Sequence, residues 1–377
     1  MSLHKNAASA LSRVLTACAA LIALTVSNDT LSAQFHQEAC LPEPCPCLLA
    51  DMVIYGDFLY WQVNPDGLEF ARKFGISGGP ASAAQKGKIL SPKCELEPGF
   101  RAGLIVGLGC CEWDLFGQFT WLGQKFSSSA TAPFTPVVPP PPNGNQADQS
   151  LHPLIYNQGI AGAYPLTSAE GEWDSKINVF DFGLGRTFEI NACFDFRPHL
   201  GFKTTWQDLK YNVRYQTLVV TEEQQVTSSF VSIWHATDFS GIGLRGGFDA
   251  SWNFTPGFRA VGGISQAAVW SSIEAHREDF YSLSGQEPVK NVDVFINECV
   301  LIPVTELIAG LRYDGYWCDT DFFFFIGWEA QVWWNLNRFI FIENSSLEGN
   351  SGTNSAQFGP SGNIAYQGLT LRFGFGY

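Results

Sequence analysis

The last fourteen residues, 364–377 (IAYQGLTLRFGFGY), alternate between two kinds of side chain. One face is apolar and ends on an aromatic residue, whereas the other face is small or polar. The apolar face carries Leu369, Leu371, Phe373, Phe375 and Tyr377, and the other face carries Thr370, Arg372, Gly374 and Gly376. A period of two is typical of a half-buried β-strand. An apolar outer face with a polar inner face favours the closing strand of a transmembrane β-barrel over the edge strand of a soluble sandwich.

The composition of the whole chain fits the same interpretation. Of 377 residues, 15% are charged and 14% are aromatic, while a soluble domain averages about 25% charged residues. The mean hydropathy is +0.01, and no segment after residue 33 is an apolar run of the roughly 20 residues that a membrane helix needs. A barrel reconciles these values, because its strands alternate apolar and polar residues. The net charge of −14 argues against nucleic acid as a partner.

Residues 1–33 predict a secretory signal peptide that is removed on export. Lys5 and Arg13 provide the basic end, residues 14–26 form the apolar core, and Leu31-Ser32-Ala33 offers a small-residue cleavage site. The apolar core is too short to span a bilayer. The mature chain is therefore expected outside the cytoplasm.

Alternating segments recur along the rest of the chain, joined by connections of two lengths. Short turns are expected at 110–112, 191–193, 255–257 and 318–321, and long loops at 64–98, 127–172, 216–237, 274–303 and 337–363. Outer-membrane barrels alternate in this way, with short periplasmic turns and long extracellular loops. The pattern predicts an all-β fold, a transmembrane antiparallel up-and-down β-barrel of about ten strands (range 10–14, because residues 68–74 could add a hairpin). The predicted domains are the signal peptide (1–33), a Cys/Pro-rich periplasmic N-terminal arm (34–51) and the barrel (52–377).

Cysteines gather at the predicted periplasmic end. That end carries Cys40, Cys45, Cys47, Cys110, Cys111, Cys193 and Cys318, whereas Cys94 and Cys299 lie on the external side. In an exported protein they predict disulfides, and an odd number leaves at least one thiol unpaired or intermolecular. Cross-links to another copy or to other Cys-rich envelope proteins are one interpretation, and a fully internal set is the alternative. The C-x4-C-P-C spacing of the arm lacks the paired C-x2-C of a zinc site, so no metal is expected.

The inward positions of the strands predict the lining of a lumen. The candidates are Arg101, Asp114, Asp181, Asp195, Arg197, Lys203, Arg245, Asp249, Arg312, Asp314, Glu329 and Arg372, and Glu189 is counted with them. Six basic and seven acidic groups nearly cancel, so opposite charges can pair across the ladder and ion selectivity should be weak. No nucleophile, metal or nucleotide motif occurs and the histidines are scattered, so neither an enzyme nor a cofactor is expected.

Several segments resemble the Legionella-type pore-forming major outer-membrane proteins, a MOMP-like family that is expanded in environmental relatives of the chlamydiae. The opening signature is D-F-L-Y-W at 57–61 followed by D-G-L-E-F-A at 66–71. Further matches are F-R-A-G-L (100–104), F-G-L-G-R (182–186), R-P-H-L-G (197–201), G-L-R-G-G (243–247) and Q-G-L-T-L (367–371). The resemblance covers most of the mature chain and implies an outer-membrane porin. The many cysteines favour the chlamydial branch of the family. For that branch, the resemblance implies a porin that disulfides link into a cell-wall network. The family has no catalytic residues to transfer.

The expected function is passive diffusion of small hydrophilic solutes and ions through a weakly selective porin of the bacterial outer membrane. The alternative is a structural or adhesive outer-membrane protein with a narrow or closed lumen. Outer-membrane lipid and the barrel-assembly machinery are expected partners, besides the disulfide-linked partners named above. The resemblance implies that Phe373, Phe375 and Tyr377 form the assembly signal.

Overall fold

The computed structural model describes residues 52–75, 86–108, 113–133, 149–155, 166–220, 226–282, 286–317, 320–345 and 353–376. The predicted signal peptide and arm lie outside these residues, and so do Cys40, Cys45, Cys47, Cys110, Cys111, Cys318 and Tyr377. Predictions about them remain predictions.

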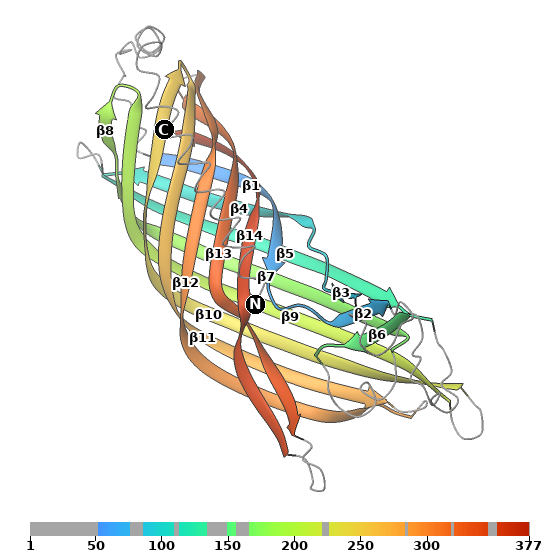
Figure 1. The fold of residues 1–377 in the computed structure, drawn as a ribbon. Helices are drawn as coiled ribbons and strands as arrows, with labels where there is room; N and C mark the ends of the chain where they lie inside the picture. The colour runs from blue at the N-terminus through green and yellow to red at the C-terminus, as the bar shows by residue number, and fades with distance from the viewer. Residues whose placement is uncertain are drawn as a thin grey trace.

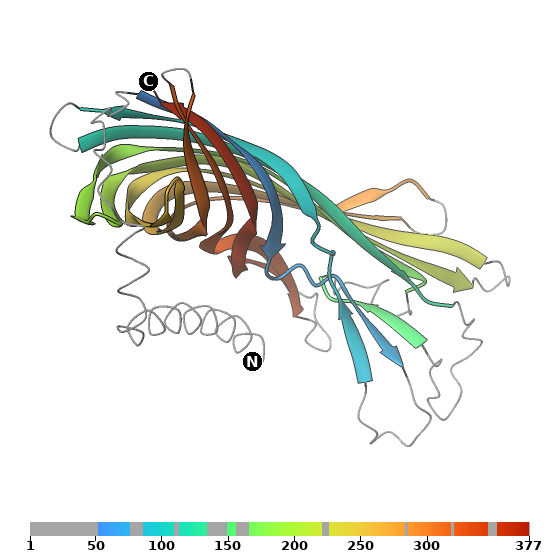
Figure 2. The same cartoon turned by 90° about the horizontal axis from the view of Figure 1, so that it is seen from above.

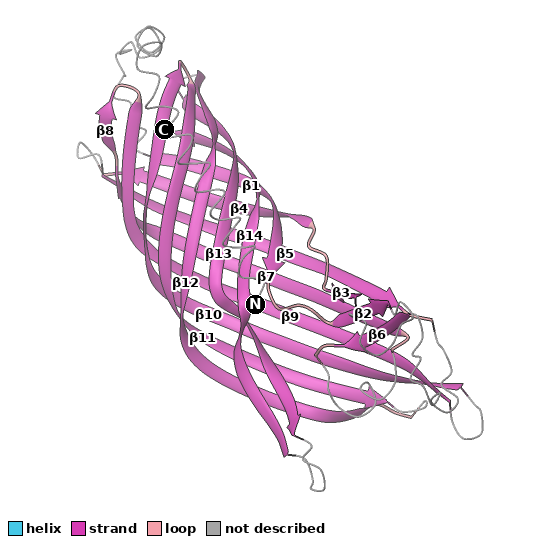
Figure 3. Cartoon of the chain, in the orientation of Figure 1, coloured by secondary structure: helices cyan, strands magenta, loops and turns pink. Residues whose placement is uncertain are grey.

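Ten long strands of the described part of the chain form a closed antiparallel barrel (Figures 1 and 3). In chain order they are β1 (Met52–Pro65), β4 (Leu96–Gly107), β5 (Trp113–Thr131), β7 (Ser168–Arg186), β9 (Phe194–Val220), β10 (Val226–Thr255), β11 (Phe258–Ser282), β12 (Val289–Trp317), β13 (Thr320–Ser345) and β14 (Thr353–Gly376). Each strand pairs with the next, and β1 closes the barrel against β14, from Val53 opposite Gly376 to Pro65 opposite Ile364. The predicted fold class and strand number are confirmed. Among the described residues, no helix is long and apolar enough to cross a membrane.

Exposed apolar side chains form a band around the outside of the barrel, in the half that carries the short turns. Phe182, Leu200 and Leu244 belong to it, each exposed on a neighbouring strand. Farther from the turns the outward side chains become charged, as at Asp208 and Asp238. A continuous apolar band of this kind is where a bilayer surrounds a barrel. The barrel therefore has a membrane-spanning half and an extension beyond it.

The strands of the extension are longer than the sequence analysis expected. β10 has 30 residues and β12 has 29, whereas about 9–11 residues of a tilted strand cross a bilayer. The prediction of loops at 216–237, 274–303 and 337–363 is wrong for most of their length, because paired strands occupy these segments. For example, β9 and β10 remain paired as far as Val220 opposite Val226. The physical reason is that these segments alternate without an apolar outer face, so a transmembrane pattern does not detect them. Figure 2 shows the long strands continuing past the closed barrel.

A second, three-stranded sheet lies at the outer end of the extension (Figure 2). It consists of β2 (Ala71–Gly75), β3 (Lys86–Leu90) and β6 (Gln149–Pro153). Leu68, Phe70 and Leu151 from this region are buried in the same apolar cluster as the inner face of the barrel. The segment 68–74 therefore closes over the extension and adds no strand to the barrel.

The turn end of the barrel lies opposite, next to the C-terminus (Figure 1). In the β10–β11 turn Gly257 has φ 75°, a conformation that favours glycine, and its carbonyl accepts a 2.8 Å hydrogen bond from the Asp314 amide. A short strand that the sequence analysis did not separate, β8 (Phe188–Asn191), pairs with the start of β9.

Candidate functional site in the barrel lumen

All twelve luminal candidates lie on the inner face of the barrel strands, in the membrane-spanning half. They fall into three groups, around Arg101, Lys203 and Arg197. Glu189 is the exception, because it lies on the exposed strand β8 and joins none of these groups. The structure thus brings the twelve together, while their role in a pore stays a prediction.

The Arg101 cluster joins five strands. Arg101 on β4 donates two hydrogen bonds of 2.9 Å to Glu329 on β13 and one of 3.1 Å to Asp57 on β1. Its Nε donates to Thr120 Oγ1 at 3.0 Å, and Arg372 on β14 donates to Asp57 at 2.8 and 2.9 Å. The Arg101 side chain is 4% exposed and that of Asp57 is 0% exposed. A buried ion pair is tolerated when further hydrogen bonds offset the loss of hydration, and this cluster provides them.

The Lys203 cluster is built in the same way on the opposite wall. The Lys203 side chain has no exposed area, and its Nζ lies 2.7 Å from a carboxylate oxygen of Asp181 and 2.7 Å from one of Glu306. Arg245 donates to Glu306 at 2.8 Å and to Ser265 Oγ at 2.8 Å. Lys203 on β9 and Glu306 on β12 are three strands apart in the sheet, so their side chains meet inside the lumen and not along its wall.

Two neutral side chains connect these clusters. The Tyr55 hydroxyl donates to Gln118 Oε1 at 2.9 Å, and Gln118 Nε2 donates to Asp181 at 3.0 Å. Every barrel strand thereby contributes one residue to a ring that we call the luminal belt. The belt consists of Asp57, Arg101, Gln118, Asp181, Lys203, Arg245, Ser265, Glu306, Glu329 and Arg372. Its four cations and four anions give a net charge of zero.

Beyond the belt, toward the extension, the inner face becomes apolar. Leu59, Trp61, Trp173, Phe239 and Trp333 are each at most 2% exposed, and we call them the apolar plug. Phe239 meets Trp333 edge to face, with 6.0 Å between ring centroids. Barrels of about eight strands have an interior that side chains can fill. In this ten-strand barrel the plug side chains are buried against one another, and most charged side chains of the belt are buried in their ion pairs.

A cavity of about 330 Å³ with charged and apolar walls lies on the turn side of the belt. It adjoins the Arg197 cluster, which consists of Asp114, Asp195, Arg197, Asp249, Arg259, Arg312 and Asp314. All of these except Asp114 and Asp314 line the cavity. Arg197 pairs with Asp114 and, at 2.9 Å, with Asp249. The side chains of Asp249 and Arg312 are 39% and 34% exposed, so this cluster is more open than the belt.

Sequence reasoning missed two charged members of the belt, Asp57 and Glu306. Asp57 begins the D-F-L-Y-W signature, and its inward parity with Tyr55 and Leu59 could have identified it. Glu306 lies three residues after the expected loop 274–303. In both cases the alternation of the strand places a charged residue on the inner face, and this could have identified it as a luminal residue.

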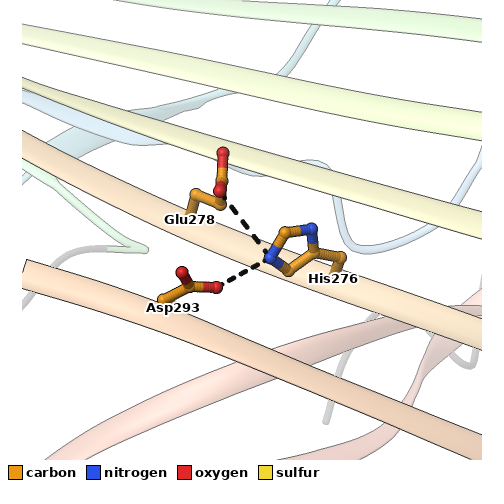
Figure 4. Close-up of side chains that lie close together, drawn as sticks. All are labelled: His276, Glu278 and Asp293. Carbon is orange, nitrogen blue, oxygen red and sulfur yellow. Dashed lines mark hydrogen bonds and ion pairs between the residues drawn. The ribbon is translucent and has the colours of Figure 1, made fainter. Parts of the chain in front are cut away.

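A group of possible metal ligands lies on the outer face of the extension, away from the lumen. Figure 4 shows His276 and Glu278 of β11 beside Asp293 of β12, with His276 Nε2 2.9 Å from Asp293 and 3.8 Å from Glu278. Glu278 stands directly opposite Asp293 in the ladder, a like-charge pairing that is unfavourable alone. Lys290 Nζ pairs with Glu278 and, at 3.1 Å, with Asp293, and these hydrogen bonds raise the pKa of Lys290. The ammonium group already occupies the position that a cation would take.

The remaining site predictions concern cysteines and the closing strand. Cys193 is in a disulfide bond at the turn end, whereas Cys94 and Cys299 are free thiols on the extension side. Phe373 and Phe375 point outward from β14 and pack edge to face at 4.6 Å. Their role in assembly is untested by this geometry.

The sequence matches the family model described as "Legionella pneumophila major outer membrane protein precursor" over residues 44–371. That description names an outer-membrane protein and no enzyme class. No curated protein matches the sequence.

Solved structures with similar folds include the outer membrane protease OmpT from Escherichia coli, at 10% identity over 86% of this chain and 96% of that chain, with a TM-score of 0.36. The P. putida toluene transporter TodX has 6% identity over 87% of this chain and 90% of that chain, with a TM-score of 0.24. A Pseudomonas aeruginosa FadL homologue has 7% identity over 86% and 89%, with a TM-score of 0.22. Nothing about activity is transferred from these three proteins.

Proposed function

The chain belongs to the family of the Legionella pneumophila major outer membrane protein. Because of its buried luminal belt, we propose that it is a structural surface protein whose lumen is closed at rest. It is a β-barrel protein of the outer membrane. In this proposal the membrane-spanning half anchors the chain, and the extension presents a folded β-surface beyond the bilayer.

The luminal belt is the observation that supports a closed lumen. Open passage of solutes needs a continuous column of water, but the Lys203 side chain has no exposed area and that of Arg101 is 4% exposed. Removing one partner from a buried pair of this kind costs about 3–5 kcal/mol. Thermal fluctuation alone would rarely open such a belt, and the apolar plug behind it adds a second barrier.

Liposome swelling tests the closed lumen. Refolded full-length protein in liposomes should admit arabinose no faster than protein-free liposomes do, because no hydrated column crosses the belt. Protease protection of the barrel, measured on the same liposomes, controls for insertion. Fast swelling by verified, inserted wild-type protein would contradict the closed lumen.

Passive diffusion of small hydrophilic solutes and ions is the second candidate. The cavity of about 330 Å³ on the turn side of the belt, with charged residues in its walls, favours it, together with the family resemblance. The belt has a net charge of zero, so a lumen that opened there would select weakly between ions. Stepwise conductance with similar cation and anion permeability in a planar bilayer would support this candidate over the first.

We also propose that thiols at the turn end attach the protein to another copy or to Cys-rich envelope proteins. Cys193 shows that oxidised cysteine is compatible with this end of the fold. Non-reducing electrophoresis of oxidised envelopes should give high-mass species that collapse on reduction. If only monomer appears under oxidising conditions, the proposed cross-links are absent and the alternative of a fully internal disulfide set is favoured.

A further inference from the structure

A second pocket, of about 440 Å³, lies in the extension, outside the membrane-spanning half. Its volume is within the range of roughly 300–1,000 Å³ that is typical of small-molecule sites. One wall comes from β13, which has φ 56° at Asn335 and shifts its pairing with β14 between Trp333 and Asn337. Figure 1 shows the hairpin turning away from the barrel beyond this point. Phe339 and Phe341, which follow the shift, line the pocket.

The hydrogen-bond donors of this pocket are already engaged. Arg277 donates two bonds of 2.8 Å to Asp279 and one of 2.7 Å to the Ile340 carbonyl. The Tyr211 hydroxyl donates to the Leu68 carbonyl at 2.7 Å. An anionic ligand would meet a guanidinium that is already neutralised and a hydroxyl that is already bonded.

The charge that remains uncompensated is that of Glu69, which lines the same pocket. Within the described part of the chain, the Glu69 carboxylate has no hydrogen bond or ion pair. Its charge is felt at Tyr211, whose pKa is raised by burial first and then by Tyr215 and Glu69. The Tyr211 and Phe339 rings lie 5.5 Å apart, and the faces of such rings attract cations.

We propose that this pocket binds a small organic cation with an apolar body. The cationic group would lie beside the Glu69 carboxylate, and the apolar body would pack against Phe339, Phe341 and Ile233. Charge complementarity selects the cation, because the pocket has one unpaired carboxylate and no unpaired basic group among its described residues.

Calorimetric titration of the refolded full-length protein, in a nonionic maltoside, tests the proposal. Benzyltrimethylammonium should bind, whereas benzyl alcohol and benzoate should bind at least about tenfold more weakly. Glu69→Gln should weaken binding of the cation by about tenfold and leave benzyl alcohol unchanged. Glu170→Gln is the matched control, because Glu170 is exposed on the outer face of β7, and it should bind as the wild type does.

Three results would overturn the proposal: equal binding of the cation and benzyl alcohol, full affinity in Glu69→Gln, or an equal loss in Glu170→Gln. Phe341→Ala provides a second variant at a half-exposed position, and it should weaken both benzyl ligands alike if the apolar wall is correctly assigned. Because binding is measured without solute flux, failure here is distinguishable from failure of the closed lumen.

Discussion

Lys203 is the cation of the luminal belt whose side chain has no exposed area. An ammonium group without exposed surface is costly unless carboxylates and hydrogen bonds replace its lost hydration. The carboxylates of Asp181 and Glu306 form ion pairs with it at 2.7 Å each. Parity predicted that Lys203 points inward, but parity could not predict its partners. Glu306 reaches it from three strands away, and that contact depends on how the barrel closes.

Lys203→Ala should lower the free energy of unfolding by about 3–5 kcal/mol, because it removes the closest cation of the buried Asp181 carboxylate and leaves Glu306 with Arg245 alone. Urea unfolding of the refolded protein, followed by tryptophan fluorescence, measures the change. Lys125→Ala is the control: the Lys125–Glu172 pair is exposed, at 62% and 34%, and should cost at most about 1 kcal/mol. Equal effects of the two substitutions would show that the buried ion pairs of the belt stabilise the fold no more than an exposed pair does.

At the scale of elements, the extension is where sequence reasoning and structure diverge. The membrane-spanning parts of the strands were found because their outer face is apolar, as at Phe202 and Leu244. The extensions keep the period of two with the polarity exchanged: Val231 and Ile233 are buried inside, whereas Asp238 is exposed outside. A search for apolar outer faces therefore ended each strand at the bilayer, and the rest was interpreted as loop. The candidate pocket near Glu69 could not be predicted, because two separate connections and the four strands β9, β10, β11 and β13 form it.

The β10–β13 contact of the extension should weaken in acid. His235 is buried, its Nε2 accepts a 3.2 Å hydrogen bond from the Ile340 amide, and burial and then Arg277 lower its pKa from 6.5 to about 3. His276, which lowers this pKa further, Asp279, Tyr211 and Glu69 are the other titratable groups near this contact. Below pH 6.5 the opened segment takes up a proton that the closed segment does not, so stability is constant above pH 6.5 and falls as the pH drops toward 3. At ~1.4 kcal/mol per pKa unit the full loss is roughly 5 kcal/mol.

Hydrogen exchange at the Ile340 amide, corrected for its intrinsic pH dependence, measures this loss. Exchange should accelerate between pH 7 and pH 4. His235→Gln keeps an acceptor without the titration and should remove the acceleration, whereas His276→Gln, at an exposed position, should not. Identical pH profiles for wild type and His235→Gln would refute the assignment.

At the scale of the whole molecule, the same alternation of polar and apolar residues is used in the bilayer and, with the two faces exchanged, in water. In the membrane half the charges lie inside and the apolar residues outside, and in the extension the apolar residues lie inside. The turn end, the strand number and the direction of each strand followed from the lengths of the connections, because short and long connections must lie at opposite ends of a barrel. Whether the lumen is open did not follow, since the same inward charges can line water or pair with one another.

Closure of the barrel depends on the last strand, which pairs with β13 on one side and β1 on the other. Phe375 stands opposite Ile54 and Phe322 and points outward into the apolar band. Deleting residues 375–377 removes the final pairings on both sides together with two aromatic residues of the predicted assembly signal. We expect this deletion to abolish insertion into the outer membrane, measured by fractionation and surface proteolysis. Deleting three residues at 349–351, in the sequence between β13 and β14, should leave insertion intact. Normal insertion of the C-terminal deletion would show that the closing strand is held by its remaining pairs alone and carries no assembly signal.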